Sequence, residues 1–142
     1  MRIIVWAALI VGLGASAASA ATVRVDVAGF RSTTGEVRCA MFRGPDGFPR
    51  DLAQAERRVP AAIEGNVATC LFENVLAGPA AVSVIHDAND NQKLDFKFGL
   101  IPREGLGWSN NPPVGMRPPS FEAARFEVGA NPITMTIRLL HR

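Results

Sequence analysis

The chain has 142 residues, a formal net charge of +2 and 48% hydrophobic residues. This length suits one ordinary domain with a real hydrophobic core. The near-balance of 15 basic and 13 acidic residues excludes a strongly basic surface of the kind that binds nucleic acid, and we therefore expect no nucleic-acid partner.

The first twenty residues have the pattern of a secretory signal. Arg2 precedes an apolar run from Ile3 to Leu13, and the small residues Ala-Ser-Ala follow at 18–20. Such a run is short for a membrane span, and small residues at its end are typical of a cleavage site. We predict that residues 1–20 are removed, and that 21–142 form a single periplasmic or secreted domain without a membrane span. An uncleaved membrane anchor is the alternative.

Five short segments in which apolar and polar residues alternate, and a sixth, Ala80–Ile85, that is apolar except for Ser83 as in a central strand, indicate an all-β fold. A period of two places successive side chains on opposite faces of a strand. Turn residues such as Gly, Pro and Asn separate the segments. The predicted strands are Thr22–Val27, Glu36–Phe42, Val67–Phe72, Ala80–Ile85, Arg125–Val128 and Ile133–Leu139.

Two further segments have the features of short helices. Asp51 can cap a helix over Asp51–Arg58, and Ser120 can cap a turn over Phe121–Ala124. A long connection rich in Gly, Pro and Asn runs from Lys93 to Pro119, and loops of this length are often functional. The sequence predicts an Ig-like two-sheet sandwich with one short helix and this long loop.

Cys39 and Cys70 are the two cysteines of the chain. In an oxidising compartment two cysteines most simply form one disulfide. Two buried thiols or a metal site are the alternatives. A metal site is poorly supported because there is no C-x-x-C pair and the two histidines, His86 and His141, lie far apart in the sequence. We predict a Cys39–Cys70 disulfide.

The stretch HDANDNQKLD, residues 86–95, carries oxygen-bearing side chains at alternate positions. This is the spacing of the first half of a calcium loop, in which alternate residues direct oxygens at a hard cation. Lys93 would contribute its backbone carbonyl. The predicted ligands at positions one, three, five, seven and nine are Asp87, Asn89, Asn91, Lys93 and Asp95.

Two positions depart from a full EF-hand. Gln92 stands where a glycine makes the sharp turn, and Phe98 stands where a bidentate glutamate closes the site. The closing carboxylate must then come from elsewhere, with Glu104 as the first candidate and Glu122 as the second. We expect weak Ca²⁺ binding, with a Kd on the order of 10⁻⁴ to 10⁻³ M. The alternative is that these Asp and Asn residues only form turns.

Three other polar or aromatic residues are candidates for parts of a site. His86 is a candidate general base, but a strand-end histidine bonded to a neighbouring carbonyl is the simpler expectation because no activated nucleophile accompanies it. Ser109 lacks the G-x-S-x-G context of a hydrolase nucleophile. We expect Gly105–Asn111 to be a tight loop whose Asn amides bond to the backbone. Trp108 either covers the edge of the core, as we expect, or contacts a ligand.

Three longer motifs resemble a bacterial secreted family known as domain of unknown function 2141. The chain has LAGPAAVSVIHDANDNQKLD, then GLIPREGLGWSNN, then PPSFEAARF, in the order found in that family. The likeness covers nearly the whole mature chain. The resemblance implies a transthyretin-like or carboxypeptidase-regulatory-like β-sandwich, a kind of module that usually binds or supports rather than catalyses. It implies no particular activity.

We therefore expect a non-catalytic β-sandwich in a binding or envelope-associated role, with an envelope or extracellular partner and weakly bound Ca²⁺. One alternative is a hydrolase that uses His86 and Asp87. The other is a carbohydrate- or peptide-binding module that uses Trp108, which would then have to be exposed beside a groove.

Overall fold

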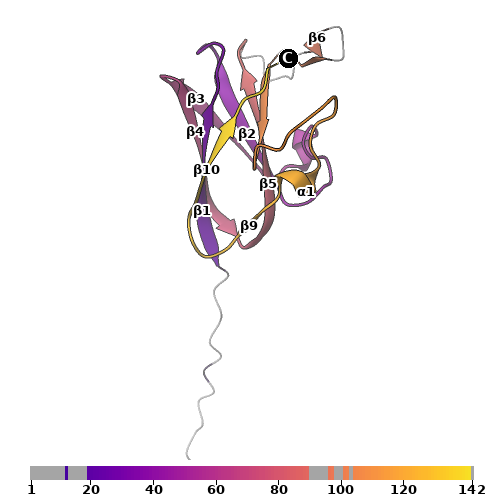
Figure 1. Ribbon diagram of the computed structural model, residues 1–142. Helices are drawn as coiled ribbons and strands as arrows, with labels where there is room; N and C mark the ends of the chain where they lie inside the picture. The colour runs from indigo at the N-terminus through magenta and orange to yellow at the C-terminus, as the bar shows by residue number, and fades with distance from the viewer. Residues whose placement is uncertain (1–11, 13–18, 90–95, 98–100, 103, 142) are drawn as a thin grey trace, which may run out of the picture.

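The computed structural model describes residues 12, 19–89, 96–97, 101–102 and 104–141. Strands make up nearly all of its regular structure (Figure 1). The strands are β1 (Ala20–Ala28), β2 (Glu36–Phe42), β3 (Arg57–Glu64), β4 (Val67–Leu76), β5 (Gly78–Asp87), β6 (Phe96–Lys97), β7 (Ile101–Pro102), β8 (Gly105–Trp108), β9 (Phe126–Val128) and β10 (Ile133–Arg138). Helical turns are η1 (Leu52–Gln54) and α1 (Phe121–Ala124). The predicted all-β class is confirmed.

The main strands form one curved sheet that nearly closes into a barrel. In the described part of the chain the strand order is β10-β1-β4-β3-β2-β5-β8, and β9 pairs with the first residues of β5. β1 and β10 are parallel, whereas β2 and β5 are antiparallel. An isolated bridge between Leu106 of β8 and Leu140, just after β10, brings the two ends of this order together.

This arrangement differs from the predicted sandwich of two separate sheets. β3 pairs with β2 along six residues, Glu36 to Met41 of β2, but with β4 only at its end, where Ile63 and Glu64 pair with Ala68 and Val67. β3 therefore passes from one layer to the other. The Leu106–Leu140 bridge joins the layers again, so the sheet is barrel-like rather than clearly layered.

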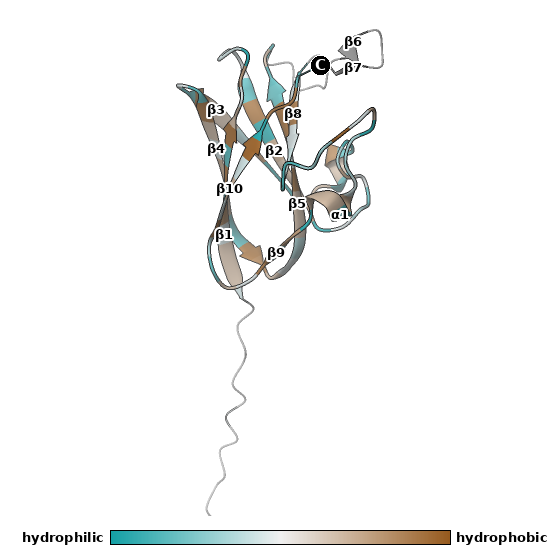
Figure 2. Ribbon diagram, viewed as in Figure 1, coloured by the Kyte–Doolittle hydropathy of each residue, from teal (hydrophilic) through white to brown (hydrophobic). Residues whose placement is uncertain are grey.

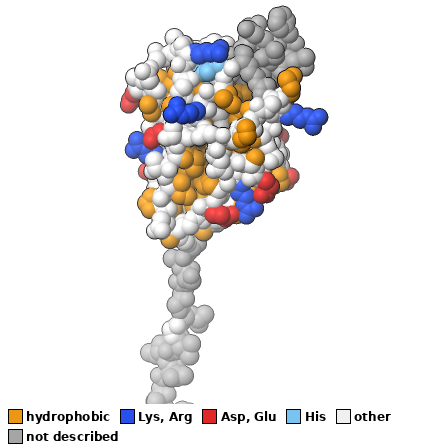
Figure 3. Space-filling view, viewed as in Figure 1, with side chains coloured by type: hydrophobic (Ala, Val, Ile, Leu, Met, Phe, Trp, Pro, Cys, Tyr) orange, Lys and Arg blue, Asp and Glu red, His pale blue; other side chains and the backbone are white. Residues whose placement is uncertain are grey.

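Alternating apolar side chains fill the interior of the barrel. Val23, Val25 and Val27 of β1 have no exposed surface, because every second residue of this strand faces inward. Figure 2 shows the apolar residues distributed along the strands, and Figure 3 shows positive and negative side chains interspersed on the visible face. Cys39 of β2 and Cys70 of β4 lie at disulfide distance in this core, with their Cα atoms 6.5 Å apart, as the prediction requires.

A second, smaller apolar cluster covers the outer face of β2, β5 and β8. Its buried members are Ala40, Phe42, Ala81, Trp108, Phe121 and Ala124. The ring of Phe48 makes edge-on contacts with Phe42 and Phe121, at centroid distances of 5.2 and 5.9 Å. The segments that contain η1 and α1 pack against the barrel here (Figure 1).

The predicted helices are correct for one segment and too long for the other. Ser120 caps α1, since its side chain accepts a hydrogen bond from the amide of Ala123. Asp51 caps a helical turn in the same way, but the turn ends at Gln54 and β3 begins at Arg57. These residues form β3 instead of continuing the helix because alternate side chains of the strand pack on the core and its backbone pairs with β2.

Of the predicted signal segment, residues 1–11 and 13–18 lie outside the described residues. No helix in the described part is long and apolar enough to cross a membrane.

Gly105–Trp108 forms a strand, β8, where a tight loop was expected. Its pairing with β5 supplies the backbone bonds that a loop would lack.

Candidate functional site

The predicted calcium loop begins at the last residue of β5. Asp87 pairs in register with Glu36, the first residue of β2, and is 1% exposed. Asn89 follows at the surface. The other predicted ligands of the series, Asn91, Lys93 and Asp95, lie outside the described residues.

Asp87 has a cationic neighbour that no local pattern in the sequence indicates. Nε of Arg38 lies 3.5 Å from Oδ2 of Asp87, and the same guanidinium donates a hydrogen bond to the carboxylate of Glu36. The side chain of Arg38 is 29% exposed. Because a nearby positive charge stabilises a buried carboxylate, Arg38 would compete with any metal cation for Asp87.

Glu104, the first candidate for the closing ligand, directly precedes β8. His86 pairs with Gly105, so Asp87 and Glu104 occupy neighbouring positions at the same end of the β5–β8 pair, and both are buried. Glu122, the second candidate, is exposed on α1 and forms an ion pair with Arg125 at 3.5 Å. Among the described residues, no group of three His, Cys, Asp or Glu side chains is placed to hold a metal ion.

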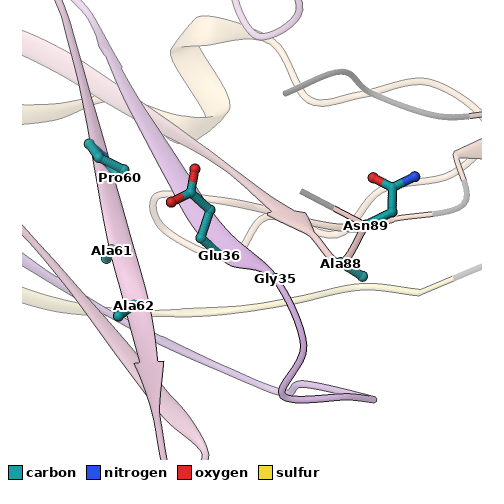
Figure 4. Close-up of a pocket in the computed structure, with 7 residues that line it drawn as sticks. All are labelled: Gly35, Glu36, Pro60, Ala61, Ala62, Ala88 and Asn89. Atoms are coloured by element: carbon teal, nitrogen blue, oxygen red, sulfur yellow. The ribbon is translucent and has the colours of Figure 1, made fainter. Parts of the chain in front are cut away.

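A shallow pocket of about 560 Å³ lies beside the start of β2 (Figure 4). Its lining residues are Gly35, Glu36, Pro60, Ala61, Ala62, Ala88 and Asn89. Small apolar residues of β3 form one side, and Asn89 stands on the other, with the Glu36 carboxylate between them (Figure 4). These residues offer one carboxylate, which Arg38 already contacts, and no nucleophile.

His86 is part of the structural framework at this end of the barrel. It is 3% exposed, its Nε2 lies 2.8 Å from the carbonyl oxygen of Thr34, and its ring contacts Phe30 edge-on at 5.0 Å. A carbonyl can only accept, so this nitrogen donates. The expectation of a strand-end histidine bonded to a neighbouring carbonyl is confirmed.

Ser109 joins two strands and the short helix through one hydroxyl group. Its Oγ accepts a hydrogen bond from the amide of Val82 at 2.9 Å and donates one to the carbonyl of Ala124 at 2.5 Å. Its own amide donates to the carbonyl of Val82. β5 pairs with β9 before Val82 and with β8 after it, so Ser109 fills the break between the two partners.

The next two residues use their side-chain amides in the same way. Nδ2 of Asn110 donates to the carbonyl of Arg125 at 2.7 Å. The carboxamide of Asn111 donates to the carbonyl of Thr136 at 2.9 Å and accepts from the amide of Arg138 at 2.8 Å. Both asparagines have positive φ angles, 68° and 45°, which Asn adopts more readily than most residues. The predicted bonding of these amides to the backbone is confirmed.

Trp108 is 7% exposed and belongs to the second apolar cluster. It is buried in the cluster that also contains Phe42 and Phe121. The prediction that it covers the edge of the core is confirmed. A carbohydrate- or peptide-binding role would need an exposed Trp108, and this burial contradicts it. Burial is favourable because it removes the large apolar ring from water.

No curated protein and no solved structure matches the chain. One family model matches residues 25–136, from within β1 to within β10, and it is described as an uncharacterized protein conserved in bacteria, DUF2141. The match covers well over half of the sequence and agrees with the resemblance of the three motifs. The chain belongs to this bacterial family of uncharacterized proteins, DUF2141.

Proposed function

We propose that this protein is a secreted or periplasmic, non-catalytic β-module that binds a partner at the cell envelope or outside the cell. One observation carries the proposal. Four polar side chains of the long motifs form hydrogen bonds with the backbone of other segments, namely those of His86, Ser109, Asn110 and Asn111. Side chains that are engaged in such bonds stabilise a scaffold rather than react with a substrate.

The hydrolase alternative would need an accessible nucleophile within reach of a base. Ser109 has no exposed surface, and two backbone groups occupy its hydroxyl. His86 is buried and donates from Nε2 to Thr34. Both side chains are therefore committed to bonds whose loss would weaken the fold, which favours the non-catalytic proposal.

We also propose that the barrel-like sheet is a strongly bent form of a transthyretin-like sandwich. One layer would be β10-β1-β4 and the other β3-β2-β5-β8, because β3 and β4 pair at only two residues each. The pair Cys39–Cys70 connects the two layers across β3. Such a covalent link is expected in an oxidising compartment, and this supports export.

The proposed ligand of the module is a weakly bound calcium ion at the end of β5. Asp87 would be the first ligand and Glu104 the closing carboxylate, since they are neighbours in the β5–β8 pairing. Asn89, Asn91, the carbonyl of Lys93 and Asp95 would complete the set. Arg38, 3.5 Å from Asp87, would compete with the ion, which agrees with a Kd on the order of 10⁻⁴ to 10⁻³ M.

The export proposal is tested by expressing the whole chain with residues 1–20 and determining the N-terminus of the product. The expected product begins at Ala21, is recovered from the periplasm or the medium, and has no free thiol. A cytoplasmic product that begins at Met1 would contradict export. Periplasmic material that still begins at Met1 would support the membrane-anchor alternative instead.

The non-catalytic proposal is tested with His86→Gln, which retains a side-chain N–H donor at a comparable position. The variant is expected to remain folded, and neither it nor the wild type should turn over ester or glycoside substrates. Hydrolysis by the wild type that His86→Gln abolishes, without a change in the circular dichroism spectrum, would favour the hydrolase.

A further inference from the structure

The barrel closes more weakly at one side than at the others. Seven residues of β2 pair with β5, six of β1 pair with β10, and two of β3 pair with β4. Between β8 and the C-terminal segment 137–141, the described backbone contributes one bridge, in which Leu106 and Leu140 exchange hydrogen bonds of 3.0 and 2.7 Å. We call the contact between residues 105–111 and residues 136–141 the seam.

Asn111 takes the place of a neighbouring strand beside this bridge. Its carboxamide, like a peptide group, offers one donor and one acceptor in a plane. It bonds to the carbonyl of Thr136 and the amide of Arg138, which are groups of an edge strand that β1 pairs with on its other side. A side chain therefore protects an edge of β10 that would otherwise be open.

Two glycines let the C-terminal segment lie directly against β8. A Cβ atom at Gly107 would stand 2.6 Å from Cγ2 of Ile137, and one at Gly105 would stand 2.7 Å from the ring of His141. The segment is also attached to the residue that follows β1, because Nε2 of His141 donates to the carbonyl of Gly29 at 2.7 Å. The seam is thus held by close backbone approach and a few discrete hydrogen bonds.

We propose that the seam is a latch that opens as one unit while the rest of the barrel stays folded, and that Asn111 holds it closed. The bonds that cross it are few, and Leu140 is 43% exposed, two features of regions that open locally. The Cys39–Cys70 link lies between β2 and β4, so opening does not strain it.

Amide hydrogen exchange of the oxidised full chain tests the latch, with Asn111→Gly compared to Asn110→Gly. The pair is matched, because both positions have positive φ angles that glycine accepts without strain. Both side chains also bond to backbone carbonyls, but Asn110 bonds to the α1 segment. Only the first substitution removes bonds at the seam.

The latch predicts that Asn111→Gly speeds exchange of the Leu106 and Leu140 amides together, on the order of tenfold to thirtyfold, since two hydrogen bonds of about 1 kcal/mol each are lost. These two amides do not bond to Asn111, so their response reports opening of the unit. The Val25 and Cys70 amides should change far less, and Asn110→Gly should leave Leu106 and Leu140 unchanged.

Faster exchange of the Arg138 amide alone would overturn the latch, because it would show a purely local bond. Equal effects of the two glycine variants on Leu106 and Leu140 would overturn it as well. If Asn111→Gly does not fold, Asn111→Asp keeps the acceptor for Arg138 but not the donor for Thr136. The latch then predicts an intermediate increase at Leu106 and Leu140, and wild-type rates at both would contradict it.

Discussion

The carboxylate of Asp87 and the guanidinium of Arg38 lie 3.5 Å apart on the neighbouring strands β5 and β2. The carboxylate is almost completely buried, whereas the arginine side chain is about one third exposed. The first predicted calcium ligand thus has a cation of the protein itself beside it. We expect Arg38 to stabilise the fold through this contact and to lower the affinity of the proposed metal site at the same carboxylate.

Arg38→Gln should lower the free energy of unfolding by about 1–3 kcal/mol. The substitution removes the positive charge that stabilises the buried carboxylate of Asp87. Urea unfolding measures the change. Arg24→Gln is the control, since Arg24 makes an exposed ion pair with Asp26 at 3.0 Å and such pairs contribute about 1 kcal/mol or less. Equal losses for the two variants would show that the buried Arg38–Asp87 contact stabilises the fold no more than an exposed ion pair does.

Gly35→Ala should be among the most damaging single substitutions in the barrel. Gly35 has a φ of 76°, and a Cβ atom there would lie 1.9 Å from the carbonyl oxygen of Asp87. Both the backbone angle and the clash oppose a side chain, so we expect a loss on the order of 3 kcal/mol. Gly44→Ala, where a Cβ atom would meet nothing within 4 Å, should unfold at nearly the wild-type urea concentration.

Ser109→Ala should cost about 2–3 kcal/mol, because the amide of Val82 and the carbonyl of Ala124 would both lose a buried partner. The control is Ser120→Ala, which removes the exposed cap of α1 and should cost about 1 kcal/mol. Chemical unfolding monitored by tryptophan fluorescence measures both. The structural role of Ser109 is wrong if its replacement costs no more than that of Ser120.

Reduction of the Cys39–Cys70 pair should lower stability by about 3–4 kcal/mol on the chain-entropy estimate for a sequence separation of 31 residues. Unfolding in urea with and without a reductant gives the difference. Two titratable thiols in the native, unreduced protein would contradict the disulfide before any unfolding is measured.

Local patterns predicted the strands whose alternation is strong. β2 has the predicted bounds, Glu36–Phe42, because Val37, Cys39 and Met41 alternate with smaller or polar residues. β3 was missed, since Arg57, Pro60 and two alanines are poor strand residues. Pairing with β2 on one side overrides that local preference, and such pairing is not visible in a single sequence.

The same limit applies to the candidate site. The roles of His86 and of the Asn110 and Asn111 amides were predicted correctly, because Asn side chains in turns commonly bond to the backbone and no activated nucleophile accompanies His86. Arg38 was not found, since its partner Asp87 lies far along the chain and no local spacing connects them. The nearly closed, barrel-like sheet was not predicted either, because its closure depends on one bridge, Leu106–Leu140, and on the glycines that allow it.

Thermal unfolding of the oxidised protein in calcium tests the proposed ion site most directly, with Asp87→Asn and Arg38→Gln beside the wild type and Mg²⁺ as the control cation. At calcium about tenfold above the expected Kd, the wild type should gain about 1.4 kcal/mol, or roughly 3–8 °C in Tm. Asp87→Asn should lose this gain, and Arg38→Gln should reach it at lower calcium because the competing charge is gone. A Tm that calcium leaves unchanged in both the wild type and Arg38→Gln would contradict the site.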